Sequence, residues 1–216
     1  MLVLTFSTGI IDALGYLGLD RVFTANMTGN VVILGMGLAG ADDLPVVGPV
    51  IALVFFMAGA VVGGRALRRR TAEWTVGTTG LLIGVGIVLA VLGVVLVLWA
   101  DPPEPALLVV TAVLALVMGM QAAAARGIAV KDVTTVVVTS TITGLSMDSR
   151  LAGGTGSLWA RRILAVILIL LGALVGALLL KVSIGLGLLV PAVISIVVGI
   201  IGHRLGREDQ AEPDAS

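Results

Sequence analysis

Residues 22–30 read Val22-Phe23-Thr24-Ala25-Asn26-Met27-Thr28-Gly29-Asn30. This polar stretch lies between two apolar segments, and residues 133–147 form a second polar stretch in the equivalent part of the second half of the chain. Gly29 interrupts helical continuity, and irregular backbone at membrane depth is tolerated only against protein or a water-filled cavity. Whether these two stretches cross a membrane therefore decides the architecture.

The composition places the chain in a lipid bilayer. Of its 216 residues, 58% are hydrophobic and 12% are charged, whereas a soluble domain carries about 25% charged residues; the mean hydropathy is +1.17. The formal net charge is +0, so nucleic acid is not an expected partner. The chain has no cysteine and one histidine, His203, which argues against metal sites and nucleophilic catalysis. We expect no metal, no cofactor and no enzymatic activity.

Six apolar segments are long enough, or nearly so, to span a bilayer, which takes about 20 residues. They cover residues 1–19, 44–66, 76–99, 105–125, 163–180 and 184–201. The two polar segments, 22–39 and 133–147, are of similar length but rich in Thr, Ser and Asn. Met1 opens directly onto apolar sequence without a basic n-region, so we expect the first segment to remain in the mature protein.

The positions of Arg and Lys favour six crossings. If all eight segments crossed, the basic residues would divide 8 to 5 between the two sides. If the polar segments enter and leave on the same side, the division becomes 11 to 2, with only Arg21 and Lys181 outside, in agreement with the positive-inside rule. We predict an all-α membrane protein with six transmembrane helices, two polar broken or re-entrant segments and both termini in the cytoplasm. Eight spanning helices are the alternative.

The second half of the chain echoes the first. Residues 9–13, Gly-Ile-Ile-Asp-Ala, lie over residues 119–123 at an offset of 110, and residues 59–63 lie over 172–176 at an offset of 113. Three crossings in each half would invert one half relative to the other, which is the common plan of transporters. We expect a first repeat over residues 1–100, a hinge loop at 101–105, a second repeat over 106–203 and a polar cytoplasmic tail at 204–216, together one membrane domain.

Small-residue patterns indicate where helices approach closely. Gly59 and Gly63 form one G-x-x-x-G pattern, and Gly172 and Gly176 form another. Such patterns allow close helix packing, and we expect that packing within one chain. Assembly into a homo-oligomer is the alternative.

Asp12 lies in the middle of the first apolar segment, where an ionised carboxylate costs about 2.5 to 3.5 kcal/mol on insertion scales. It predicts a proton or cation site lining a polar cavity. The alternative is a carboxylate that is neutralised by protonation or by an Asn or Thr donor of the polar segment. Half-helices starting near Gly29 and near Thr139 would direct their positive dipole ends to the midplane, which suits an anion or an electron-rich polar group.

The predicted solute or ion path consists of Asp12, Asn26, Thr28, Gly29, Asn30, Gln121, Thr139 and Thr141. The structural alternative for the Thr residues is that their hydroxyls bond to helix carbonyls or to neighbouring helices.

With these residues in view, the chain resembles the YoaK family of bacterial membrane proteins, a family of unknown function. Residues 9–13 and 22–30 carry the resemblance. The second half is looser: residues 119–123 and the pair Thr139-Ser140 depart from the Gly-x-Gln-Asn-Ala and Thr-Gly patterns of the family. Members of the family usually begin with a short basic cytoplasmic stretch, and this sequence has none before its first apolar segment. A misannotated or internal start at Met1 is therefore an alternative to a true start. The resemblance implies a bacterial membrane location and no established substrate.

These observations predict a small-solute transporter or channel of the bacterial inner membrane. Besides the lipid bilayer, its partner would be an unidentified small polar or anionic solute, with Asp12 as the residue that couples movement to protons. A membrane organising or accessory protein is the alternative, in which the polar stretches hold helices together and nothing passes.

Overall fold

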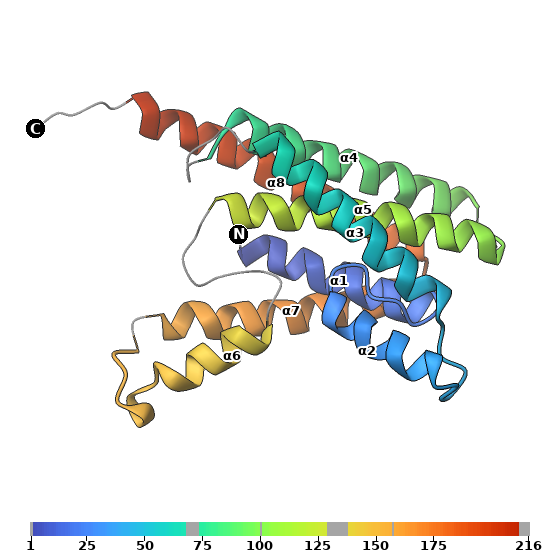
Figure 1. Cartoon of the computed structure of the whole chain (residues 1–216). Helices are drawn as coiled ribbons and strands as arrows, with labels where there is room; N and C mark the ends of the chain where they lie inside the picture. The colour runs from blue at the N-terminus through green and yellow to red at the C-terminus, as the bar shows by residue number, and fades with distance from the viewer. Residues whose placement is uncertain (1, 68–73, 100, 129–137, 157, 212–216) are drawn as a thin grey trace, which may run out of the picture.

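The computed structural model describes residues 2–67, 74–99, 101–128, 138–156 and 158–211. Within these ranges the chain forms eight α-helices, a short 3-10 helix at Arg150–Ala152 and no strand. The α-helices are α1 (Leu2–Gly18), α2 (Met27–Leu38), α3 (Val47–Leu67), α4 (Val76–Leu98), α5 (Glu104–Gly127), α6 (Val138–Met147), α7 (Trp159–Leu180) and α8 (Ile184–Ala211), as Figure 1 shows. The predicted all-α fold is confirmed.

Five of these helices, α3, α4, α5, α7 and α8, are long and apolar enough to cross a membrane. Helix α1 has 17 residues, at the lower end of the spanning range. These six helices match the six predicted apolar segments. Helix α5 begins at Glu104, inside the expected hinge at 101–105, with Pro105 in its first turn, where a missing N–H costs no hydrogen bond. The polar residues 204–211 continue α8.

Helices α2 and α6 are half-length. They have 12 and 10 residues, which at 1.5 Å per residue give about 18 and about 15 Å, whereas a hydrocarbon core is about 30 Å thick. Figure 1 shows α2 beginning beside the middle of α1 and running back to the end where α1 finishes, while α6 runs to the opposite end of the molecule. Of the polar segment 22–39 only 27–38 is helical, and residues 133–137 of the other segment lie outside the described residues. The number of crossings stays a prediction.

The long helices pack in three main pairs, α1 with α7, α3 with α5, and α4 with α8. Smaller contacts join α1 to α8 and α4 to α5. If α1–α4 are exchanged with α5–α8, the pair α1–α7 becomes α5–α3, the contact α1–α8 becomes α5–α4, and α4–α8 maps onto itself. In Figure 1 each helix of the first set runs opposite to its counterpart in the second.

Glycines set the close approach of α1 and α7. Gly9 faces the backbone carbonyl of Ile169, and Gly172 faces the backbone carbonyl of Phe6. A Cβ added to either glycine would overlap that oxygen. The two backbones are therefore in direct contact, as small residues allow in membrane helices.

The same arrangement joins α3 to α5. Gly119 faces the carbonyl of Phe56, and Gly59 faces the carbonyl of Leu116. Each of these four residues lies 110 or 113 positions from its counterpart in the contact between α1 and α7. The offsets seen in the sequence recur in the contacts, and the glycine pairs pack within one chain, as expected.

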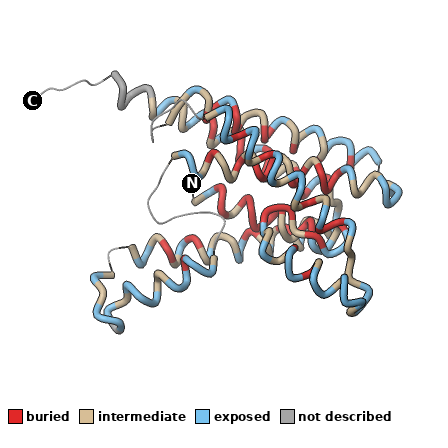
Figure 2. Tube along the Cα trace, viewed as in Figure 1, coloured by how far each residue is buried: buried red, intermediate tan, exposed pale blue. Residues whose placement is uncertain are grey.

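Helix α1 lies at the centre of the core. Its Leu4, Ile10, Ile11 and Leu14 are fully buried, together with side chains of α4 and α8. The outer faces of α3 and α7 expose large apolar side chains such as Met57 and Leu170, and Figure 2 shows burial concentrated inside the bundle. An apolar outer surface over spanning-length helices is the arrangement that a bilayer requires, so the fold is that of an all-α membrane protein.

Candidate functional site

Asp12 holds the chain that returns along α1. After α1 ends, the backbone reverses at Asp20 and Arg21, which have φ of 55° and 57°, a left-handed conformation uncommon outside glycine. Asp12 Oδ1 then accepts hydrogen bonds from the backbone N–H groups of Thr24 (3.1 Å), Ala25 (2.8 Å) and Asn26 (3.4 Å). These amides belong to no helix, so a carboxylate on the adjacent helix satisfies them.

Asn30 holds the same segment from the other side. Its side chain is fully buried, and its Oδ1 accepts a hydrogen bond from the N–H of Phe23 at 2.9 Å. Its Nδ2 donates to the carbonyl of Phe23 at 2.6 Å. One amide side chain thus satisfies both backbone polar groups of Phe23.

Asn26 begins α2. Its side-chain oxygen accepts a hydrogen bond from the N–H of Gly29 at 3.2 Å, which makes it the N-cap of the helix. Gly29 lies against the ring of Phe23, and a Cβ there would come within 2.7 Å of the ring. The glycine is required for this close approach, and the cap fixes where the half-helix starts.

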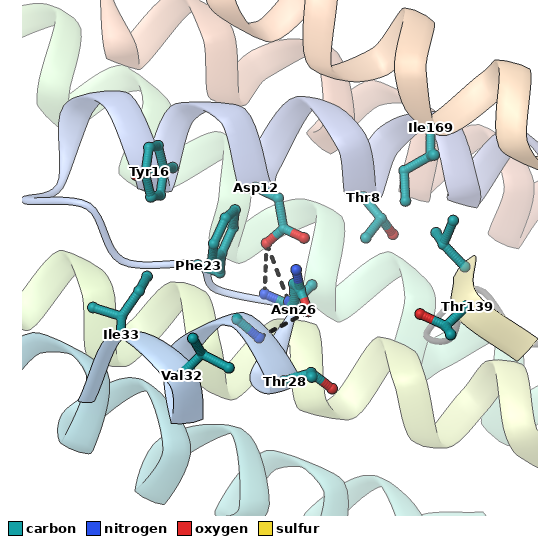
Figure 3. Close-up of a pocket in the computed structure, with 13 residues that line it drawn as sticks. Thr8, Asp12, Tyr16, Phe23, Asn26, Thr28, Val32, Ile33, Thr139 and Ile169 are labelled. Atoms are coloured by element: carbon teal, nitrogen blue, oxygen red, sulfur yellow. Dashed lines mark hydrogen bonds between the residues drawn. The ribbon is translucent and has the colours of Figure 1, made fainter. Parts of the chain in front are cut away.

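A cavity of about 490 Å³ opens beside this segment. Figure 3 shows it between α1, the returning segment, the start of α2 and the start of α6. Its lining consists of Thr8, Asp12, Tyr16, Phe23, Ala25, Asn26, Thr28, Gly29, Val32, Ile33, Val138, Thr139 and Ile169. The first residues of both half-helices therefore face one space beside the middle of α1.

The structure brings together five of the eight predicted path residues. Asp12, Asn26, Thr28, Gly29 and Thr139 line the cavity. Thr28 and Thr139, which lie 111 residues apart in the sequence, face it from different half-helices.

The other three predicted path residues lie outside the lining. Asn30 is engaged with Phe23, and Thr141 is buried on α6. Gln121 is buried, and its Oε1 lies 3.4 Å from the hydroxyl of Ser195, which donates to it from α8. Gln121 thus joins α5 to α8 within the core.

Sequence reasoning missed eight of the lining residues, and three of these, Thr8, Tyr16 and Phe23, carry a hydroxyl or an aromatic ring. The rings of Tyr16 and Phe23 are stacked, with centroids 4.9 Å apart and an interplanar angle of 24°. Thr8 and Tyr16 lie four residues before and four after Asp12, so they share its helix face. That spacing was available in the sequence as a signal.

The charge of the cavity is carried by one group. Among the described residues that line it, Asp12 is the acidic side chain, and no Arg or Lys is present. Asp12 is half-buried. Within the described ranges, no group of three or more Asp, Glu or His side chains could hold a metal ion.

A buried arginine fixes the far end of α6. Arg162 on α7 is 7% exposed; it forms an ion pair with Asp148 and donates a hydrogen bond to the carbonyl of Gly144 at 2.6 Å. A Cβ at Gly144 would lie 2.9 Å from the guanidinium carbon. A cation at a helix C-terminus is favourable, so this contact anchors the half-helix whose other end faces the cavity.

Comparison of the sequence with known proteins places the chain in a protein family. Residues 1–201 match the family model described as "Protein of unknown function (DUF1275)". The chain is 29% identical over 147 residues to the UPF0700 transmembrane protein YoaK of Bacillus subtilis (strain 168), a match covering 68% of this chain and 64% of that protein. The chain thus matches less than two thirds of the length of this relative. No solved structure matches.

The family match extends over both half-helices and all six long helices up to residue 201. It includes the cavity lining and the returning segment that Asp12 and Asn30 hold. This protein belongs to the DUF1275 family and is an integral membrane protein similar to YoaK.

Proposed function

We propose that this protein moves a small polar solute across the bacterial inner membrane, as a transporter or channel. One observation carries the proposal: two half-helices, too short to span, start at one polar cavity beside the middle of α1. Membrane transporters place their substrate sites at the ends of such broken helices, near the bilayer midplane. Helices that had only to pack would gain nothing from leaving polar backbone and a carboxylate at this depth.

The arrangement of the long helices supports the proposal. Counterpart helices run in opposite directions, and the glycine contacts between α1 and α7 recur between α3 and α5 at the offsets of the sequence echo. We propose that these halves are inverted repeats, with six crossings and both termini in the cytoplasm. Rocking of one half against the other would then open the cavity alternately to each side.

The test is flux into liposomes that carry the purified protein. Vesicles with wild-type protein should admit some members of a panel of small polar solutes faster than protein-free vesicles. Asp12→Asn, which keeps an acceptor for the amides of the returning segment, should abolish any dependence of that flux on a proton gradient. If flux keeps that dependence in Asp12→Asn, the coupling role is refuted. If vesicles with folded wild-type protein stay tight to the whole panel, transport is refuted.

A second function is favoured by a different observation. The side chains of Asn30 and Gln121 form hydrogen bonds that join different segments of the chain. This is expected of a membrane organising or accessory protein. In that case Asp12→Ala would lower stability and partner binding and leave permeability unchanged. The liposome experiment separates the two functions.

A further inference from the structure

We propose that the cavity beside Asp12 binds an organic cation, a small amine that is protonated or quaternary. This rests on the same cavity as the proposed transport function and names the class of solute that it would take. The half-helix dipoles alone favour an anion, so the argument depends on the side chains that face the space.

The carboxylate of Asp12 has one oxygen left for a ligand. Its Oδ1 takes all three backbone amides, and no hydrogen bond to Oδ2 is found among the described residues. Figure 3 shows the second oxygen directed away from the returning segment, on the side of Thr8. A ligand could supply the counter-charge that no described lining residue gives this carboxylate, and an isolated charge is costly at membrane depth.

Among the described residues, no basic side chain supplies that counter-charge. No Arg or Lys is among the described lining residues. Arg21 donates to the carbonyl of Asp42 at 3.1 Å, and Arg162 pairs with Asp148. An anion in the cavity would therefore meet an unscreened carboxylate, whereas a cation would complete an ion pair.

Two aromatic rings complete the chemistry. Tyr16 and Phe23 both line the cavity, and their rings stack on each other, with Phe23 between Tyr16 and Asp12 in the view of Figure 3. Carbon-bearing cations are attracted to the faces of aromatic rings within about 6 Å, and aromatic residues recognise quaternary ammonium groups in this way. A volume of about 490 Å³ lies within the range of about 300 to 1,000 Å³ that is typical of small-molecule pockets.

The positive end of α2 is already compensated. Asn26 caps the helix through the N–H of Gly29, and Asp12 accepts the amides that directly precede the helix. An anion would find these donors occupied. The negative charge of the Asp12 carboxylate therefore has more influence on the ligand than the helix dipole of α2, and it favours a cation.

The test is direct binding to the full chain in detergent micelles, independent of flux. Choline serves as the cationic probe, 3,3-dimethyl-1-butanol as its uncharged isostere, and acetate as the anion. Wild-type protein should bind choline at least about tenfold more tightly than the isostere, since charge pairing at a desolvated site exceeds about 1.4 kcal/mol, which is a factor of ten in affinity. Acetate should not compete.

Two variants locate the binding. Asp12→Asn should reduce choline affinity to that of the isostere. Tyr16→Leu should lower the affinity for choline about three- to thirtyfold, as expected for loss of a cation–π contact. The control is Trp99→Leu, which replaces an aromatic residue at the C-terminal end of α4 and outside the cavity lining, and it should leave the affinity unchanged. Tyr16 is 37% exposed and outside the hydrogen bonds that hold the returning segment, so this pair of variants decides the matter even if Asp12→Asn does not fold.

Equal binding of the isostere, or displacement of choline by acetate, would overturn the inference. Choline binding that depends on Asp12 and Tyr16 without flux in liposomes would uphold the cation site and refute transport. Flux of a neutral or anionic solute without choline binding would refute the cation site and leave transport standing.

Discussion

Replacing Asn30 by alanine should unfold the returning segment, because no other side chain in the described part of the chain satisfies the backbone of Phe23. Asn30 is fully buried and makes two hydrogen bonds, at 2.9 and 2.6 Å, to the N–H and the carbonyl of Phe23. Each buried backbone group left without a partner costs about 1 to 3 kcal/mol, so the two together cost about 2 to 6 kcal/mol. Phe23 is half-buried beside the cavity, where water can replace part of the loss, so we expect about 2 to 4 kcal/mol.

Asn26→Ala is the matched control, since it removes an asparagine from the same segment. Asn26 is exposed and makes one N-cap hydrogen bond, to Gly29, and loss of such a cap costs about 0.5 to 2 kcal/mol. Both free energies of unfolding can be measured by SDS titration in mixed micelles, followed by circular dichroism. A loss in Asn30→Ala no larger than in Asn26→Ala would refute the assignment of Asn30 as the residue that holds Phe23.

Three further predictions concern the scaffold and its orientation. Gly59→Val should separate α3 from α5 and cost at least about 1 to 3 kcal/mol, measured by thermal unfolding in detergent, whereas Gly64→Val, on the same helix but facing open space, should cost less than about 1 kcal/mol. Arg162→Met should destabilise the end of α6 by about 1 to 2 kcal/mol. We use this low range because Asp148, the partner of Arg162, is half-exposed and water screens the ion pair. The measurement is limited proteolysis, in which the connection from α6 to α7 should be cut faster in the variant. Single cysteines at Ala41 and Gly153, treated in intact cells with an impermeant thiol reagent, should be labelled at Ala41 and protected at Gly153; labelling of both would establish eight crossings.

The long helices could be predicted because their physical cause is local. Each predicted apolar segment is long enough to cross a bilayer, and a helix is found at each one. The glycines at 9, 59, 119 and 172 were visible as an echo, since backbone contact between helices leaves no other residue at those places.

The polar segment 22–39 was predicted to be broken, but with the break at Gly29. The structure places the break earlier: residues 22–26 are non-helical, and Gly29 lies in the first turn of a helix that starts at Met27. The reason is a contact distant in sequence: Asp12 provides the acceptor that lets Thr24, Ala25 and Asn26 remain outside a helix. Such a contact depends on how the chain reverses after α1, which no local pattern specifies.

Side-chain roles were the hardest part of the site to predict. Asn30 and Gln121 are polar residues at membrane depth, and their sequence context does not reveal that their partners are Phe23 and Ser195. Tyr16 was not among the predicted path residues, because a single aromatic side chain near a helix end is no specific signal for a cavity. Its position one turn after Asp12 places its ring at the cavity instead.

The two halves use one scaffold but different chemistry at their half-helices. The segment before α2 is held by the carboxylate of Asp12, and the equivalent position on α5 is Ala122. Among the described residues, α6 is instead fixed at its far end by Arg162, which pairs with Asp148. If the polar segments served only to hold helices together, both halves could use the same contacts between a polar segment and a long helix. A single carboxylate with a free oxygen beside two rings is the feature expected if one half carries the binding site and the other mainly completes its wall.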